Sequence, residues 1–209
     1  MKEKPNMGLN VVMTNIIVTE KPHEISWEDL AELQHQAHVG NIAKGVRMLI
    51  ASCTAETLQR DLEDGITFVA QNDKSQLIGM ISVCFRKVRR WWHHGDGAYL
   101  CCLAVSPDYQ NCGVYKALNN RVEDIIREKG IEVAYLNTHI GNKIARQAYE
   151  KKGYRNVRFS PGGGPGYYSV EMAKWFGGRE KSAILCKIMY LASEIVVRVL
   201  FKPGKVRRF

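Results

Sequence analysis

The sequence lacks the long apolar runs of an exported or membrane-spanning protein. None of its 209 residues lies in an uncharged apolar stretch that approaches the about 18 residues of a spanning helix. The first ten residues, M-K-E-K-P-N-M-G-L-N, also lack the apolar core of a secretory signal. We therefore expect a cytoplasmic protein, and the C-terminal segment discussed below leaves open a peripheral position at the inner membrane surface.

The sequence also lacks the cysteine spacing of a disulfide scaffold or a zinc site. Six cysteines occur, at positions 53, 84, 101, 102, 112 and 186, with no C-x-x-C and no paired Cys/His pattern. His93 and His94 are adjacent, so on an extended chain their rings point to opposite faces. We expect reduced thiols and no metal.

Acidic residues are scarce only near the C-terminus. The chain carries 30 Lys and Arg against 21 Asp and Glu, a formal net charge of +9. Residues 179–209 contribute eight basic and two acidic side chains, or +6, and the other 178 residues contribute 22 and 19, or +3. A body this close to neutral gives little reason to expect a nucleic-acid partner.

The C-terminal segment combines an apolar helix with this basic charge. Residues 183–201 are mostly apolar, with Lys187, Tyr190, Glu194 and Arg198 forming one narrow polar stripe at helical spacing. With F-K-P-G-K-V-R-R-F behind it, the helix could lie on a membrane surface or pack on the domain or on a second subunit. We leave both open and divide the chain into a domain at 1–178 and a basic extension at 179–209.

A predicted strand, turn and helix dominate the middle of the chain. The apolar run Tyr99–Val105 reads as a buried strand, and Ser106-Pro107-Asp108 ends it because proline has no N–H for a ladder. Apolar residues at helical spacing predict a helix that begins between Asn111 and Val114, around Gly113. The unpaired N–H groups at such a helix start, with the positive end of the helix dipole, form an anion site. A glycine there lets a phosphate approach the backbone.

A second motif follows another short strand, predicted at Val133–Thr138. It reads N-K-I-A-R-Q-A-Y-E-K-K-G-Y, from Asn142 to Tyr154. Together, Q-x-x-G at Gln110 and Gly113 and this N-x-x-A-x-x-x-Y-x-x-x-G-[FY] pattern resemble two consecutive segments of the GNAT superfamily of N-acetyltransferases. The first pattern departs from Q-x-x-G-x-[GA] at its last place, where Tyr115 stands.

The resemblance implies a fold and a reaction. The fold is α/β of the α+β type: a mixed, mostly antiparallel sheet of six to seven strands with a parallel splayed pair at its centre, about four flanking helices and the C-terminal helical extension. The reaction is direct transfer of acetyl from acetyl-CoA to a primary amine in a ternary complex. The ending K-P-G-K-V-R-R-F is similar to acetyltransferases of bacterial surface-polysaccharide clusters, which favours an amino sugar, or another small amine, as the acceptor.

The resemblance also assigns residues. Tyr149 takes the place of the general acid that protonates the CoA thiolate. The residues expected to hold acetyl-CoA are Leu103, Ala104, Val105, Gln110, Asn111, Cys112, Gly113, Val114, Tyr115, Lys116, Asn137, Asn142 and Ala145. For the base we name only nearby candidates, Asp96, His93, His94 and Glu171, or a water chain. The alternative is a non-catalytic acyl-CoA-binding or membrane-tethering module, with Tyr115 as the sign of a degraded site.

The rest of the chain is read from local signals. We expect a strand at 15–19, a helix from Ser26 to about His38, an ambiguous segment at 39–53 where such enzymes often bind the acceptor, and a helix capped by Thr54. A hairpin is expected at 66–85, and a flexible flap at the glycine-rich residues 161–166 before a strand at 167–174. Residues 86–97 form a cationic stacking wall for an acidic or nucleotide-linked acceptor, a nucleic-acid patch, or a solvated connection with Trp91 or Trp92 on the core. We favour the last interpretation.

Overall fold

The fold is a seven-stranded sheet with helices on both faces. The computed structural model describes residues 15–46, 49–161, 167–177 and 180–200. The strands are β1 (Ile17–Glu20), β2 (Gly65–Gln71), β3 (Leu77–Arg90), β4 (His93–Val105), β5 (Val133–His139), β6 (Arg155–Pro161) and β7 (Tyr168–Trp175). Their order is β1-β2-β3-β4-β5-β7-β6, and every neighbouring pair is antiparallel except β4 and β5. This confirms the predicted mixed sheet with a parallel pair at its centre.

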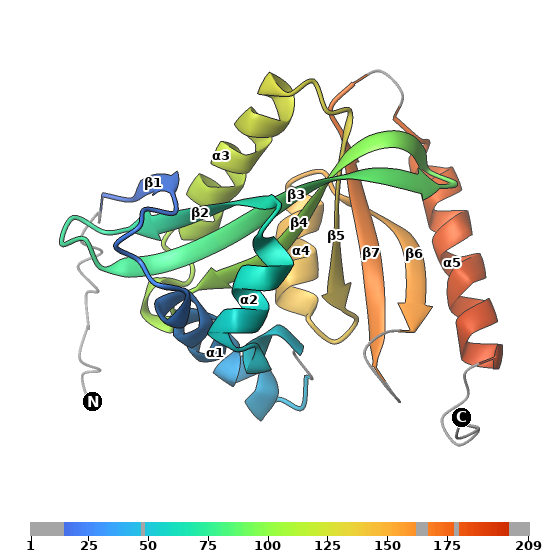
Figure 1. The fold of residues 1–209 in the computed structure, drawn as a ribbon. Coiled ribbons are helices and arrows are strands. Elements are labelled where there is room, and N and C mark those ends of the chain that lie inside the picture. Colours follow the sequence, from blue (N-terminus) through green and yellow to red (C-terminus); the bar gives the residue numbers. More distant parts are fainter. Residues whose placement is uncertain (1–14, 47–48, 162–166, 178–179, 201–209) are drawn as a thin grey trace, which may run out of the picture.

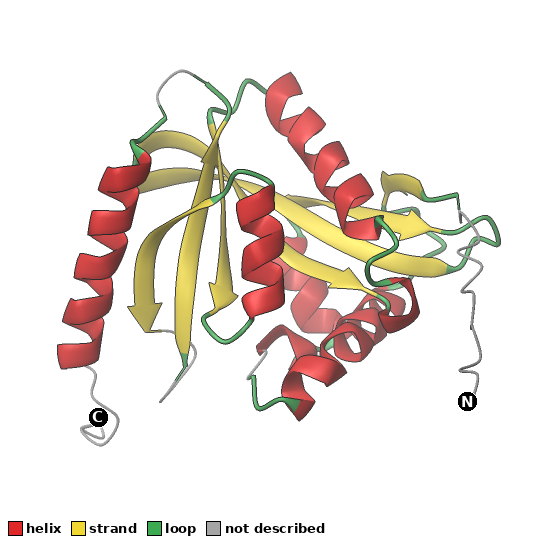
Figure 2. Cartoon of the chain, turned by 180° about the vertical axis from the view of Figure 1, so that it is seen from behind, coloured by secondary structure: helices red, strands yellow, loops and turns green. Residues whose placement is uncertain are grey.

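The helices divide between the two faces of the sheet. They are α1 (Trp27–Ala43), α2 (Ala55–Leu62), α3 (Val114–Glu128), α4 (Lys143–Lys151) and α5 (Ala183–Leu200), with short 3-10 turns η1 (Leu49–Ser52) and η2 (Pro107–Tyr109). Helices α1 and α2 lie on one face, α3 and α4 lie on the other, and α5 runs beside β6 at the edge (Figures 1 and 2). The largest buried cluster joins α3 and α4 to the sheet, and a second joins α1 and α2 to β2, β3 and β4.

The predicted caps of the first two helices are present. Ser26 and Asp29 form a reciprocal capping box at the start of α1, and Thr54 accepts a hydrogen bond from the Thr57 backbone at the start of α2. Helix α1 runs to Ala43, however, five residues past the predicted end. It continues through Gly40, which has open space around it, and the chain leaves the helix at Gly45, whose φ is +74°.

The hairpin of β3 and β4 is longer than predicted. Pairing continues to Arg90 opposite His93, so most of residues 86–97 are strand rather than connection. The indole of Trp92 explains the extension, because it is fully buried against Val133, Val157 and Ala173 of other strands. The expectation that one tryptophan packs on the core is therefore confirmed. The turn that joins the two strands is shorter than the predicted connection.

Helix α5 covers the free edge of β6. The Phe159 backbone N–H, which has no partner strand, donates to the Ser193 hydroxyl at 2.8 Å. The Arg155 guanidinium pairs with Glu180 at 2.7 Å, ahead of the helix, and the Tyr190 ring packs on Phe159 at 6.2 Å. No helix in the described ranges is long and apolar enough to cross a membrane. The flap predicted at 161–166 falls almost entirely on residues outside those that the structure describes.

Candidate active site

The site is the gap that opens where β4 and β5 separate. The two strands pair only from Ala98 opposite Ala134 to Leu100 opposite Leu136. Beyond this point β4 stays paired with β3 as far as Val105, and β5 stays paired with β7 as far as His139. The edge of β4 from Cys101 to Val105 therefore has no partner strand on the β5 side, and Leu103, Ala104 and Val105 lie along it (Figure 1).

A bulge bends β4 at the start of this free edge. Ser82 of β3 faces Cys101 while Met80 faces Ala104, so β4 has one extra residue in the interval. Cys102 lies in this interval and accommodates the extra residue with a φ of +53°, a left-handed conformation that non-glycine residues rarely adopt. From α1, the Gln34 side chain donates to the Cys102 carbonyl at 2.5 Å. The bulge is thus held in place from the α1 side of the sheet.

The turn after β4 presents unpaired backbone N–H groups. Asn111 and Gly113 have φ values of +65° and +89°, and Gly113 is the N-cap of α3. Among the described residues, none accepts a hydrogen bond from the backbone N–H groups of residues 113–116. A Cβ on Gly113 would have Ile16 Cδ1, at 4.0 Å, as its nearest neighbour, so the space in front of these groups is open. An open helix start of this kind fits a pyrophosphate.

Helix α4 contributes the predicted acid. Asn142 caps this helix, its side chain accepting from the Ala145 N–H at 3.2 Å. Tyr149 is 8% exposed, and its ring contacts those of Tyr115 and Tyr154, each at 5.9 Å between centroids. The hydroxyls of Tyr115 and Tyr154 are fully buried without a partner among the described residues.

Tyr149 is protonated at neutral pH. Burial, with the neighbouring Tyr99 and Cys101, raises the pKa of its hydroxyl above the usual 10. These two neighbours belong to β4, at the point where it leaves β5, so the Tyr149 hydroxyl lies near the gap. Burial likewise raises the pKa of Tyr99 to about 12. A phenol at this position can donate a proton but does not accept one.

The structure brings most of the predicted cofactor residues to one side of the molecule. Leu103, Ala104 and Val105 lie on the free edge, and residues 110–116 form the turn and the first residues of α3. The Gln110 side chain donates to the Val105 carbonyl at 3.3 Å, and Cys112 and Lys116 are exposed. Tyr115 turns its ring toward Tyr149, so it leaves the front of the turn clear. Asn137 is exposed near the end of β5 and faces Tyr99.

Of the base candidates, only Glu171 lies at the edge of the gap, opposite Asn137 of β5. His93 and Asp96 lie at the hairpin tip, where the His93 ring contacts the Asp96 carbonyl and Asp96 pairs with Lys87 at 2.8 Å. His94 also lies there, opposite Arg89. Glu171 is buried and accepts from the Trp92 indole at 3.1 Å, with Arg90 3.9 Å away. In the described part of the chain no three His, Cys, Asp or Glu side chains form a metal-binding group.

Sequence reasoning missed a buried histidine on the helix that contacts β4. His38 is on α1, one turn after Gln34, and is 8% exposed. Gln34 touches β4 at Cys102, and Val46 would be 3.4 Å from a Cβ on Gly141, beyond the end of β5. His38, four residues after Gln34, lies on the same face of the helix. Both ring nitrogens are buried without a partner, and burial lowers the pKa of His38. No motif marks this residue, since an isolated His on a helix has no signature in sequence.

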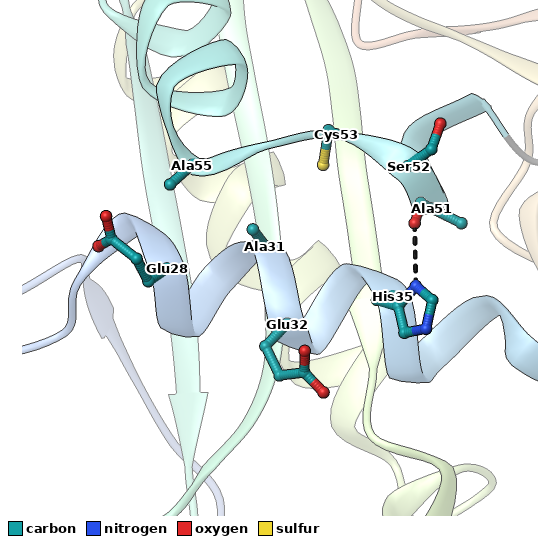
Figure 3. Close-up of a pocket in the computed structure, with 8 residues that line it drawn as sticks. All are labelled: Glu28, Ala31, Glu32, His35, Ala51, Ser52, Cys53 and Ala55. Atoms are coloured by element: carbon teal, nitrogen blue, oxygen red, sulfur yellow. Dashed lines mark hydrogen bonds between the residues drawn. The ribbon is translucent and has the colours of Figure 1, made fainter.

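A separate pocket lies between α1 and the η1–α2 segment (Figure 3). Its volume is about 370 Å³, and it is lined by Glu28, Ala31, Glu32, His35, Ala51, Ser52, Cys53 and Ala55. The His35 ring contacts the Ala51 carbonyl at 3.2 Å, while the carboxylates of Glu28 and Glu32 point away from each other. None of the lining residues belongs to β4, β5 or the turn, so this pocket is distinct from the gap.

Comparison with known proteins identifies the family. A model of the Acetyltransferase (GNAT) family matches residues 27–154. The chain belongs to the GNAT family. It is therefore an acyltransferase that uses acetyl-CoA, as the resemblance of the two motifs predicted. The matched residues include the bulge, the turn and Tyr149.

Individual relatives agree with this assignment. The ribosomal protein bS18-alanine N-acetyltransferase of Haemophilus influenzae is 27% identical over 159 residues, which cover 76% of this chain and 90% of the relative. A GNAT acetyltransferase from Staphylococcus aureus Mu50 superposes with a TM-score of 0.60 at 17% identity, covering 78% of this chain and 100% of that one. The PaiA N-acetyltransferase of Thermoplasma acidophilum, solved with coenzyme A, gives 0.55 at 22% identity, covering 78% and 99%. The two structures share the fold.

Proposed function

We propose that the protein acetylates a primary amine in the gap between β4 and β5. The observation that carries this proposal is the free edge of β4, which ends in a turn of unpaired N–H groups. Residues 113–116 would bind the pyrophosphate, and the edge from Leu103 to Val105 would pair with the pantetheine. Asn137, Asn142 and Ala145 would line the thiol end.

The chemistry needs one group to take a proton and one to give it. The amine nitrogen attacks the thioester carbonyl carbon, so a C–N bond forms, and the C–S bond breaks as the intermediate collapses. Backbone N–H groups near the bulge at Cys102 would stabilise the oxyanion. The Tyr149 hydroxyl would then give its proton to the CoA thiolate. The products are the acetamide and free CoA.

We propose that His38 accepts the proton that the amine loses. A neutral imidazole with no hydrogen-bond partner can accept a proton, and burial keeps His38 neutral at neutral pH. It lies one turn after Gln34, which contacts the free edge of β4 at Cys102, whereas His93, His94 and Asp96 lie at the hairpin tip. Placement and protonation state therefore favour His38 as the base.

We propose a small amine, such as an amino sugar, as the acceptor, in a cytoplasmic reaction. A second candidate is the N-terminal alanine of a protein, because the Haemophilus influenzae relative is named for that reaction. The test is CoA release measured with a panel of amino sugars, small amines and peptides that begin with alanine. Acetyl-CoA-dependent turnover of an amino sugar supports the first acceptor, and turnover of the peptides alone supports the second. Tight acetyl-CoA binding with no turnover of any amine would favour the non-catalytic alternative.

A further inference from the structure

Helix α5 exposes a continuous apolar face. Seven of its large apolar side chains are between 42% and 73% exposed: Ile184, Leu185, Ile188, Leu191, Ile195, Val196 and Val199. At 100° per residue they fall on one arc of the helix, opposite Cys186 and Val197, which are buried toward β6. The remaining exposed large apolar residues of the described chain are five, spread over β1, α1, η1 and α4. An apolar surface gathered in this way marks an interaction site.

The charges around this face are positive. Lys187 and Arg198 lie along one border of the apolar arc, and both are exposed. Glu194 is the sole carboxylate of α5 and pairs with Arg198 at 2.7 Å, so the two basic residues and one acidic residue give α5 itself a net charge of +1. The sequence after α5 adds Lys202, Lys205, Arg207 and Arg208, as part of the +6 carried by residues 179–209. The natural complement of an apolar face with a basic border is an anionic lipid surface.

We propose that α5 docks the enzyme on an anionic membrane surface. The seven apolar side chains would enter the interface between headgroups and acyl chains, and the basic residues would contact the headgroups. The opposite face of α5 remains packed on β6, through Ser193 and Tyr190, so docking requires no unfolding. The extension at 179–209 would thus bind the membrane while the domain at 1–178 acetylates the amine.

A second copy of this chain fits the face less well. A helix of 18 residues is about 27 Å long and about 10 Å wide, which is a narrow strip beside the about 800 Å² that each partner buries in a stable interface. Self-association would also bring together two segments of net charge +6 with no acidic surface between them. Neither objection applies to an anionic bilayer.

The test is cosedimentation of the full-length protein with vesicles. We expect it to bind vesicles of phosphatidylcholine with about one third phosphatidylglycerol at least about tenfold more tightly than vesicles of phosphatidylcholine alone. The double variant Ile188→Gln/Ile195→Gln should lose at least about tenfold of this binding, since both side chains would enter the lipid. Ile144→Gln is the matched control, because Ile144 is an equally exposed isoleucine on α4. It should bind like the wild type.

A charge variant and two further readouts complete the experiment. Lys202→Gln/Lys205→Gln should reduce the preference for anionic vesicles by about tenfold or more, at about fivefold per residue. Acetyl-CoA affinity should stay unchanged in every variant, which shows that each one is folded. Equal binding to both kinds of vesicle, or wild-type binding by the isoleucine double variant, would overturn the proposal. A dimer in analytical ultracentrifugation that dissociates in the isoleucine double variant would also overturn the proposal, because a second copy of the chain would then cover the apolar face.

Discussion

Replacing Gly113 by alanine should separate two roles of this residue: it caps α3, and it leaves room for the pyrophosphate in the proposed site. Gly113 caps α3 with a φ of +89°, a region that costs an L-residue about 1–2 kcal/mol. The added Cβ would meet nothing closer than Ile16 Cδ1 at 4.0 Å, so no clash adds to this cost. At about 2–4 °C per kcal/mol for a chain of this length, the melting temperature should fall by about 2–8 °C. The loss is small enough to leave the variant folded.

In the proposed binding mode, the same Cβ would occupy space that the pyrophosphate needs at the start of α3. A hydrogen bond to a charged group is worth about 1.5–3 kcal/mol, so losing one phosphate contact should weaken acetyl-CoA binding by about 10- to 100-fold. Gly130→Ala is the matched control. Gly130 lies at the other end of α3 with a φ of +63° and no heavy atom within 4 Å of an added Cβ. It should show the same loss of stability with unchanged affinity.

Two measurements decide between these outcomes: thermal unfolding of both variants, and calorimetric titration of both with acetyl-CoA. The reasoning fails if Gly113→Ala binds acetyl-CoA as tightly as Gly130→Ala does while both lose the same stability. Residues 113–116 would then have no part in phosphate binding.

Two further predictions concern buried ionisable groups. Burial lowers the pKa of His38 in the folded protein, so on acidification the unfolded chain binds a proton at this residue at a higher pH than the folded protein does. The free energy of unfolding should therefore decrease as the pH falls below 6.5, the ordinary pKa of histidine. His38→Gln should remove that pH dependence and lower kcat/KM by about 10²-fold or more. His35→Gln, on the same helix, should have neither effect. Wild-type activity in His38→Gln would exclude His38 as the base. Lys174→Met should cost about 3 kcal/mol in chemical denaturation, the lower end of the range for a broken buried pair. Lys174 contacts the buried Glu123 at 2.6 Å, and Arg127 also pairs with that carboxylate at 3.1 Å. If the free energy of unfolding falls by less than about 1 kcal/mol, Arg127 alone is enough to compensate the buried charge of Glu123.

Local chemistry explains what could be predicted of the fold. The cap at Ser26, the proline that ends β4 and the glycine that begins α3 act within a few residues, so they are readable in sequence. The extent of the β3–β4 hairpin was not readable, because Trp92 drives it by packing on Val133 and on strands far along the chain. Periodicity predicted α5, but it could not tell that Tyr190 faces β6 and that the apolar side faces outward.

The candidate site shows the same division. The turn and Tyr149 are parts of contiguous motifs, and the structure packs Val114 and Tyr149 in one cluster with Leu103 and Val105 of β4. The base candidates close to the motifs in sequence lie at the hairpin tip or in a buried contact with Trp92. His38 comes near the free edge of β4 only because α1 packs on that strand through Gln34 and Cys102, which is tertiary information.

The replacement of Tyr149 by phenylalanine tests the proposed chemistry most directly. It keeps the ring contacts with Tyr115 and Tyr154 and removes only the hydroxyl. Tyr154→Phe is the matched control, because its hydroxyl is buried without a partner in the same cluster. With a saturating amine found by the acceptor panel, CoA release by Tyr149→Phe should fall by about 10²-fold or more while acetyl-CoA affinity changes little, and Tyr154→Phe should turn over like the wild type. Wild-type turnover by Tyr149→Phe would contradict the account, because the tyrosine would then be packing and solvent would protonate the thiolate.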